Sequence, residues 1–108
     1  MVILTQDNFA AEVLEYQGAV LIDFYADWCA PCRLMASIVE QLEQECPDTK
    51  FGKVNVDEQA ALAMQFDIQS IPTLALVMGA EVRAVRVGIR PKEELLALLR
   101  AEQTESTR

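Results

Sequence analysis

Apolar and polar positions follow two different periods along this chain. Residues 19–25, 51–56, 73–78 and 81–87 are apolar at nearly every position or at every second position, a pattern typical of β-strands. Around them, apolar residues recur every three to four positions over about 5–16, 31–46 and 59–66 and from Pro91 onward, which predicts helices. With a short strand at the start, the predicted order is β-α-β-α-β-α-β-β-α.

Cap and turn residues agree with these boundaries. Thr5 is expected to cap the first helix, whose apolar face would hold Phe9, Val13 and Leu14. Pro31 suits the first turn of the second helix, because its missing N–H is no loss there. The apolar positions of that helix are Leu34, Met35, Ile38, Val39 and Leu42. Gly79-Ala80 separates the last two strands, and glycine in the first turn position predicts a type II′ hairpin.

The alternation of strands and helices predicts an α/β fold with a parallel sheet core and helices on both faces. The hairpin near residue 79 should add antiparallel strands at one edge of the sheet. A length of 108 residues suits one domain, over residues 1–108, in which the polar tail from about 103 to 108 is expected to fray.

Composition excludes several classes of function. Nine Lys and Arg face seventeen Asp and Glu, giving a formal net charge of −8, and a surface of that sign repels nucleic acid. No apolar run approaches the ~18 residues of a membrane span, and the start has no basic and apolar leader, so we expect no membrane association. The absence of histidine excludes Ser-His-Asp and Cys-His catalysis and every His-ligated metal site.

The most informative motif is Trp28-Cys29-Ala30-Pro31-Cys32, which follows a predicted buried strand and opens a helix. Cysteines at this spacing can close a disulfide, and the unpaired N–H groups and partial positive charge of a helix N-terminus stabilise a thiolate. Cys29 is therefore expected to be the attacking nucleophile, and Cys32 to resolve the mixed disulfide. A structural pair or half a zinc site is the alternative, but only Cys46 could add a further thiol ligand.

Asp23 interrupts an otherwise apolar strand six residues before Cys29. Burial of a carboxyl group raises its pKa, so Asp23 could accept the proton of Cys32. The alternative is an acid at the edge of the core paired with a base such as Lys53. The two interpretations are compatible, because Lys53 could tune Asp23.

Pro72, in Ile71-Pro72-Thr73, stands just before the third strong strand. An ordinary proline at a strand start is one interpretation, since only about 5% of X-Pro bonds in folded proteins are cis.

Taken together, these motifs resemble the thioredoxin family over about residues 2–101. The residues that carry the resemblance are Val20–Cys32, Lys53–Asp57, Ile71–Leu74 and Val87-Gly88. The resemblance implies a central mixed sheet of four to five strands flanked by four helices, and dithiol–disulfide exchange with protein substrates. It maps the nucleophile to Cys29, the resolving cysteine to Cys32, the buried acid to Asp23, the lysine to Lys53 and a cis-proline to Pro72. The implied docking patch for substrate comprises Trp28, Ala30, Pro31, Ile71, Pro72 and Gly88, with Ile89 as a further candidate.

The same resemblance implies a reductase of protein disulfides with no bound cofactor or metal. Its reversible Cys29–Cys32 disulfide would receive electrons from an external thioredoxin reductase, dependent on either NADPH or ferredoxin. We expect a cytoplasmic monomer. A specialised oxidant or isomerase, and a non-catalytic binding subunit, are the alternative functions.

The chain departs from the usual family pattern at two positions near the motif. Ala30 stands where glycine is usual, and intervening residues influence the reduction potential. Ser37 replaces a proline that kinks the active-site helix, which predicts a straighter helix here. Cys46, distant in sequence, is expected to be a partly buried, inert thiol.

Overall fold

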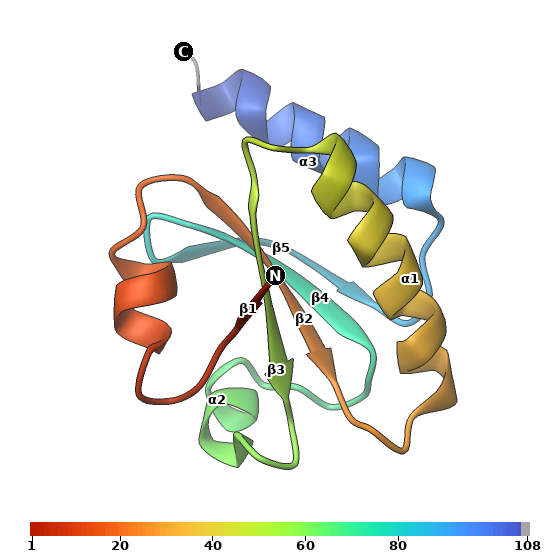
Figure 1. Cartoon of the computed structure of the whole chain (residues 1–108). Helices are drawn as coiled ribbons and strands as arrows, with labels where there is room; N and C mark the ends of the chain where they lie inside the picture. Colours follow the sequence, from red (N-terminus) through yellow and green to blue (C-terminus); the bar gives the residue numbers. More distant parts are fainter. Residues whose placement is uncertain (107–108) are drawn as a thin grey trace.

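In the computed structural model, which describes the backbone of residues 1–106 and side chains as far as Glu102, five strands form one mixed sheet (Figure 1). The strand order across the sheet is β1-β3-β2-β4-β5. The strands are β1 (Val2–Ile3), β2 (Ala19–Tyr25), β3 (Lys50–Asn55), β4 (Thr73–Met78) and β5 (Glu81–Val87). The predicted order of elements and the predicted mixed sheet are confirmed.

The helices are a π-helical turn η1 (Ala10–Leu14), α1 (Ala30–Glu45), α2 (Ala60–Gln65) and α3 (Lys92–Ser106). α1 runs without interruption past Ser37, and its degree of bending stays a prediction. α3 continues to Ser106, whereas residues 107 and 108, the end of the tail expected to fray, lie outside the described residues.

The direction of β4 decides where the site forms. β1, β3 and β2 are mutually parallel, but β4 runs antiparallel to β2, so the expected parallel core is limited to three strands. β4 begins opposite the end of β2, where Thr73 pairs with Phe24. The segment after β2 and the segment before β4 therefore meet at the same end of these two neighbouring strands.

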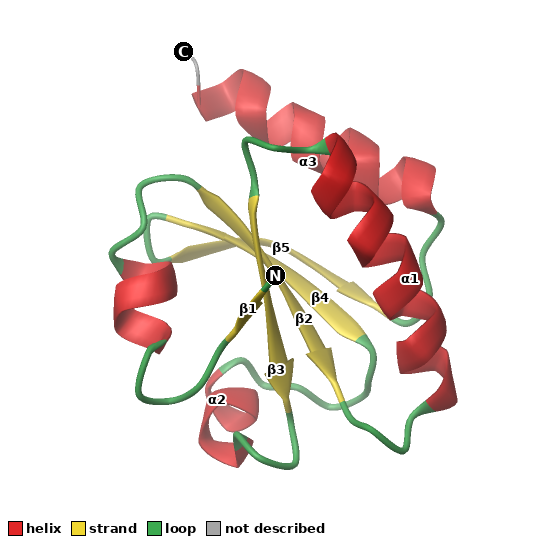
Figure 2. Cartoon of the chain, in the orientation of Figure 1, coloured by secondary structure: helices red, strands yellow, loops and turns green. Residues whose placement is uncertain are grey.

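Two apolar layers pack on opposite faces of the sheet, and side-chain alternation along β2 supplies both. Leu21 packs in the layer with residues of α1 and α3, whereas Ile22 packs in the layer with residues of η1 and α2. Figure 2 shows α1 and α3 on one side of the sheet and α2 on the other. Asp23 follows Leu21 by two positions and so lies on the α1 side of the sheet.

Two residues expected on buried helix faces are exposed instead. Leu14 and Leu34 are both solvent-exposed, while their neighbours Val13 and Met35 are fully buried. Leu14 follows Val13 directly, so it points about a quarter of a turn away from Val13 around the helix axis, outside the face that Phe9 and Val13 bury. The N–H of Glu15 donates to the carbonyl of Ala10, five residues back, which makes η1 a π-helical turn. The buried side chains of α1 are Cys32, Met35, Val39 and Leu42, which form a narrower face than the apolar pattern suggested. Leu34 lies beside this face.

The β4–β5 hairpin differs from the predicted type II′ turn. Gly79 has φ +58° and Ala80 has φ +66° between the paired residues Met78 and Glu81. Positive φ at both central positions is the mark of a type I′ turn, whose twist matches that of the flanking strands. Ala80 thus occupies a left-handed conformation that alanine adopts only at a cost.

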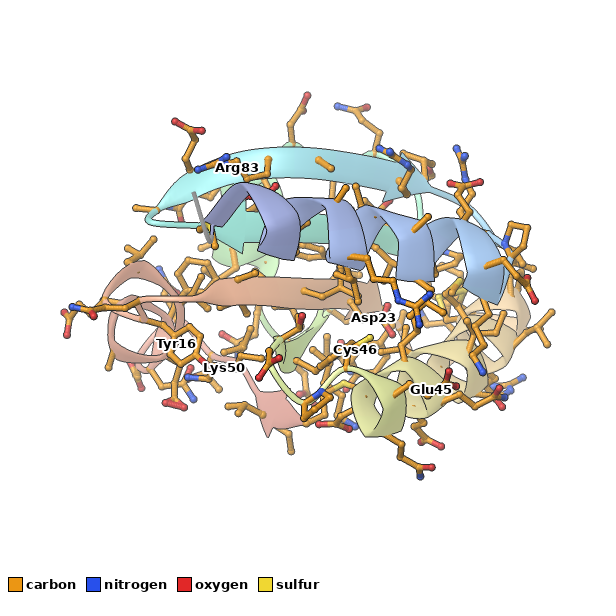
Figure 3. All side chains as sticks on the ribbon, turned by 90° about the horizontal axis from the view of Figure 1, so that it is seen from above. Tyr16, Asp23, Glu45, Cys46, Lys50 and Arg83 are labelled. Carbon is orange, nitrogen blue, oxygen red and sulfur yellow. A yellow bond between two sulfur atoms is a disulfide. The ribbon has the colours of Figure 1, made fainter. Side chains whose placement is uncertain are left out.

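Contacts at both ends stabilise the first helical segment. Thr5 Oγ1 accepts a hydrogen bond from the N–H of Asn8, and Asn8 Oδ1 accepts one from the N–H of Thr5. These bonds cap the turn that leads into η1, whereas the N-cap residue of η1 itself is Phe9, which has no side-chain cap. At the other end, Lys50 Nζ lies 4.6 Å from the centre of the Tyr16 ring (Figure 3). The same ammonium donates to the carbonyl of Glu12, which connects η1 to β3.

Candidate active site at the N-terminus of α1

Cys29 and Cys32 form a disulfide at the start of α1, with their Cα atoms 5.2 Å apart. Cys29 is the N-cap residue, with extended backbone (φ −93°, ψ 108°), and Cys32 lies in the first turn of the helix. The two sulfur atoms are therefore brought together by local chain geometry alone. Both residues are buried, and Cys29 is 4% exposed.

The helix N-terminus supplies the polar environment of Cys29. Its Sγ accepts a hydrogen bond of 3.2 Å from the backbone N–H of Cys32. In an α-helix this N–H has no carbonyl partner within the helix, so it is available to a sulfur that carries negative charge. Pro31 occupies the first turn, where its lack of an N–H leaves the helix intact.

Asp23 is the buried acid of the site. It is 3% exposed, and its Oδ1 has no hydrogen-bond partner among the described residues. Burial raises the pKa of Asp23 from 3.8 to about 7, and the charge of Lys53 opposes that rise. An acid with this pKa exchanges its proton near neutral pH.

A cavity of ≈ 480 Å³ connects Asp23 to the cysteine pair, since both Asp23 and Cys32 line it. Lys53 lines the same cavity, opposite Asp23 in the β2–β3 register. Its ammonium lies 5.6 Å from the centre of the Tyr25 ring, a residue that also lines the cavity. The structure thus brings three of the predicted site residues around one cavity.

The Ile71–Pro72 segment lies beside Cys29. Its peptide bond is cis, as the family resemblance implied. The carbonyl oxygen of Ile71 lies 4.0 Å from Cys29 Sγ, and Ile71 packs against the buried cluster of Ala26, Cys29 and Cys32. The N–H of Gly88 donates to the carbonyl of Pro72 over 2.8 Å, which brings the end of β5 to the same place.

The remaining residues of the expected docking patch lie around Cys29 and differ in how far they are exposed to solvent. Trp28 is 69% exposed, Ala30 and Pro31 are exposed, and Ile71 and Gly88 are half-buried. Pro72 is buried, so its ring presents little surface of its own. A mainly apolar groove of ≈ 410 Å³ extends from Trp28 and Ile71. Its other lining residues are Val56, Ala63, Ile68, Gln69 and Ser70.

Sequence reasoning missed a residue that holds Trp28. The indole Nε1 donates a 2.8 Å hydrogen bond to Asp57 Oδ2. Asn55, at the end of β3, accepts hydrogen bonds from the N–H groups of Asp57 and Glu58 and so orders this turn. The available signal was a polar residue two positions after a strand whose end lies beside the site.

Three further features concern metal ligands, Cys46 and membrane spans. Within the described part of the chain, no group of three or more His, Cys, Asp and Glu side chains is arranged to hold a metal ion. Cys46 is a free thiol, 7% exposed, in the core at the end of α1, and burial raises its pKa. None of the helices in the described part has the length and apolarity needed to cross a bilayer.

Comparison with known proteins agrees with this geometry. The family model described as Thioredoxin matches residues 1–101. A thioredoxin of Bacillus subtilis (strain 168) is 43% identical over 96 residues, which cover 88% of this chain and 90% of that protein. A thioredoxin of Streptomyces clavuligerus is 40% identical over 93 residues, covering 86% of this chain and 87% of the relative. One of Buchnera aphidicola subsp. Schizaphis graminum (strain Sg) is 43% identical over 93 residues, covering 85% and 86% respectively.

Proposed function

Because the chain belongs to the thioredoxin family and is a protein disulfide oxidoreductase, we propose that it works as a reductase of disulfides in other proteins. The observation that carries the proposal is the Cys29–Cys32 disulfide at the helix N-terminus, where the attacking sulfur accepts the N–H of Cys32. A sulfur in this position is stabilised as a thiolate, the form that attacks disulfides.

In the first step, Cys29 is the nucleophile. In the reduced protein its thiolate attacks one sulfur of the substrate disulfide and forms a mixed disulfide, while the other substrate sulfur leaves as a thiolate and takes up a proton. The N–H of Cys32 stabilises the negative charge before the attack.

In the second step, Cys32 resolves the mixed disulfide. Its proton passes to the carboxylate of Asp23, and its thiolate attacks Cys29 Sγ, releasing the second substrate thiolate. An electron pair has then moved to the substrate, and the Cys29–Cys32 disulfide has formed. The burial of Asp23 and the cavity that it shares with Cys32 support this role, and Lys53 would tune the acid through its charge.

Substrate would dock on the exposed apolar surface around Cys29. Trp28, Ala30 and Pro31 would contact it on the helix side, and Ile71, Pro72 and Gly88 on the opposite side. The backbone beside Pro72 would pair with an extended substrate chain in the manner of an added strand. The proximity of Ile71 O to Cys29 Sγ favours this arrangement, because a strand placed there would bring its own disulfide to the nucleophile.

The protein would return to the reduced state through a separate thioredoxin reductase. The chain carries no nucleotide-binding motif, so we place NADPH or ferredoxin chemistry in that partner. We further propose that the chain acts as a cytoplasmic monomer of one domain that transfers electrons to disulfide-containing proteins and contributes to redox homeostasis. Its acidic net charge favours solubility.

The decisive experiment is reduction of insulin with dithiothreitol as electron donor, comparing the parent with Cys29→Ser. We expect turbidity to develop rapidly with the parent and at the uncatalysed rate with the variant; equal rates in the two would refute the proposal. A reduction potential close to that of thioredoxin, about −270 mV, supports the reductase direction, and a value near −120 mV would indicate an oxidant. Cys32→Ser should trap target proteins as mixed disulfides on Cys29.

A further inference from the structure

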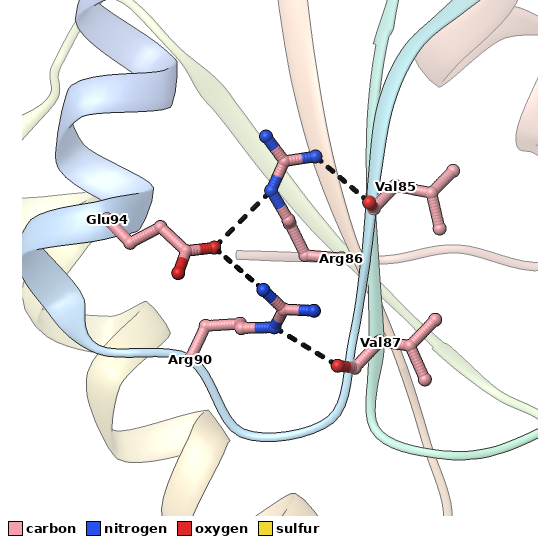
Figure 4. Close-up of polar contacts among 5 residues, drawn as sticks. All are labelled: Val85, Arg86, Val87, Arg90 and Glu94. Carbon is pink, nitrogen blue, oxygen red and sulfur yellow. Dashed lines mark hydrogen bonds and ion pairs between the residues drawn. The ribbon is translucent and has the colours of Figure 1, made fainter.

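The segment 88–91 joins β5 to α3 (Figure 4). It carries two residues of the expected docking surface, Gly88 and Ile89. Ile89 is exposed, and apart from Gly88 itself and its two chain neighbours no residue has a heavy atom within 4 Å of the place that a Cβ on Gly88 would occupy. The surface at this point is therefore open to an approaching chain. A segment without regular structure needs other contacts to keep one conformation.

Three charged side chains provide these contacts. Glu94 Oε2, on α3, forms an ion pair with Arg86 Nε at 3.3 Å and accepts a hydrogen bond of 3.2 Å from Arg90 Nη1. Figure 4 shows both guanidinium groups converging on this one oxygen. Because a single carboxylate contacts two arginines from different elements, its loss would remove one contact from each of them.

Each arginine also binds the backbone of the edge strand β5. Arg86 Nη1 donates to the carbonyl of Val85 over 3.0 Å, and Arg90 Nε donates to the carbonyl of Val87 over 3.1 Å. Among the described residues, β5 has a strand neighbour on one side only, so these carbonyls accept from side-chain donors instead. The bond from Arg90 to Val87 O closes a turn around Gly88 and Ile89.

The other side of this turn is attached to the cis-proline segment. The N–H of Gly88 donates to Pro72 O, and Gly88 has φ +85°, a conformation that favours glycine. Gly88 and Ile89 are thus held between the Pro72 segment and the cluster of Arg86, Arg90 and Glu94. The position of the docking surface depends on both attachments.

We propose that Glu94, acting through Arg86 and Arg90, is a positioning residue that holds Gly88 and Ile89 in place to receive the protein substrate. The inference rests on the proposed reductase function and concerns its specificity. Glu94 contacts neither the cysteines nor Asp23 in the interactions described above, so it acts on substrate affinity and leaves the dithiol chemistry unchanged.

The test compares Glu94→Gln with Glu93→Gln, which makes the same change one residue earlier in the same helical turn, outside the cluster. For Glu94→Gln, we expect the KM for insulin, with dithiothreitol as donor, to rise about fivefold, the size of effect typical of a partly exposed ion-pair network. The rate at which the pre-reduced protein reduces the small disulfide 5,5′-dithiobis(2-nitrobenzoate) should be unchanged, because that reagent needs no extended docking surface. Glu93→Gln should match the parent in both assays.

A structural readout accompanies the kinetics. In Glu94→Gln, the backbone amides of Ile89 and Arg90 should exchange hydrogen faster than in the parent, while those of β2 should not. Arg90→Gln should raise the KM similarly, and the double variant should add little to either single change, since the residues act through one network.

The outcomes distinguish failure of the positioning role from failure of the reductase function. An unchanged KM in Glu94→Gln, or an equal loss of activity toward both substrates, overturns the positioning role while the reductase function stands. A parent protein inactive toward insulin and the small disulfide alike overturns the reductase function and this inference with it.

Discussion

Asp23 of β2 and Lys53 of β3 are cross-strand partners in the parallel register, and the charge of Lys53 opposes the effect of burial on the protonation of Asp23. Burial raises the pKa of Asp23 to about 7, and Lys53 lowers it. Asp23 Oδ1 has no hydrogen-bond partner among the described residues, so little else stabilises its charge. This acid therefore changes charge within the physiological pH range.

The first prediction concerns stability. The folded protein holds the Asp23 proton more tightly than the unfolded chain between about pH 4 and 7, so the free energy of unfolding falls as pH rises through this window. Asp23→Asn carries no charge at any pH, and it should be more stable than the parent above pH 7. The difference between 3.8 and about 7 corresponds to at most roughly 4 kcal/mol.

Urea unfolding of the oxidised forms at pH 5, 7 and 8.5 measures this effect. The gain from Asp23→Asn should shrink steadily from pH 8.5 to pH 5. An equal or lower free energy of unfolding for the variant at pH 8.5 would contradict the assignment of Asp23 as a destabilising buried acid.

Lys53→Met should raise the pKa of Asp23 above about 7, because it removes a positive charge that favours the carboxylate. Carbon-13 NMR of the Asp23 carboxyl group during a pH titration gives the midpoint directly. Lys50→Met is the matched control: Lys50 is on the same strand but binds Glu12 and Tyr16, so the midpoint should not move. A Lys53→Met midpoint at or below that of the parent would show that the two side chains do not interact.

The third prediction separates the two chemical steps. Asp23→Asn should slow the resolving step by about a hundredfold at pH 7, because loss of a general base typically has that effect. Attack of Cys29 on the substrate should keep its rate. Single-turnover quenching with acid measures formation and decay of the mixed disulfide separately. Equal slowing of both phases would argue against Asp23 as the proton acceptor of Cys32.

The sequence was sufficient for those features of the site that are close together along the chain. Cys29 and Cys32 are three residues apart at a strand–helix junction, so their spacing alone brings the two sulfurs together. Asp23 was recognisable because an acid within an apolar strand is exceptional. The order of strands and helices also followed from the periodicity, since each element has its own apolar pattern.

Contacts between distant parts of the chain were not predictable in this way. The hydrogen bond from Trp28 to Asp57 joins residues 29 positions apart, and nothing in either segment indicates the other. The attachment of Arg86 and Arg90 to Glu94 depends on how α3 returns beside β5. The type I′ turn was missed because Ala80, unlike glycine or asparagine, does not signal a positive φ.

Ala80→Gly should stabilise the protein by about 0.5–1 kcal/mol. Alanine at φ +66° is strained by roughly 1–2 kcal/mol, and the greater flexibility of glycine in the unfolded chain offsets part of the relief. Thermal unfolding measures the gain, and Gly79→Ala serves as the opposite control, because it introduces the same strain at φ +58°. A lower stability for Ala80→Gly would contradict the turn type described here.

The last prediction concerns the indole of Trp28. Asp57→Ala removes the acceptor of its Nε1–H, so the exposed ring should lose its fixed orientation beside Cys29 while the protein loses only about 0.5–1 kcal/mol of stability. Trp28 is the single tryptophan, so the steady-state anisotropy of its fluorescence reports this motion directly and should fall. Reduction of insulin should slow about threefold, since a mobile ring must be ordered again when substrate binds, at a cost of roughly 0.5–1.5 kcal/mol. Glu58→Ala removes the neighbouring acid and should change neither signal; a similar loss of anisotropy in both variants would mean that charge near the turn, rather than the hydrogen bond, orients Trp28.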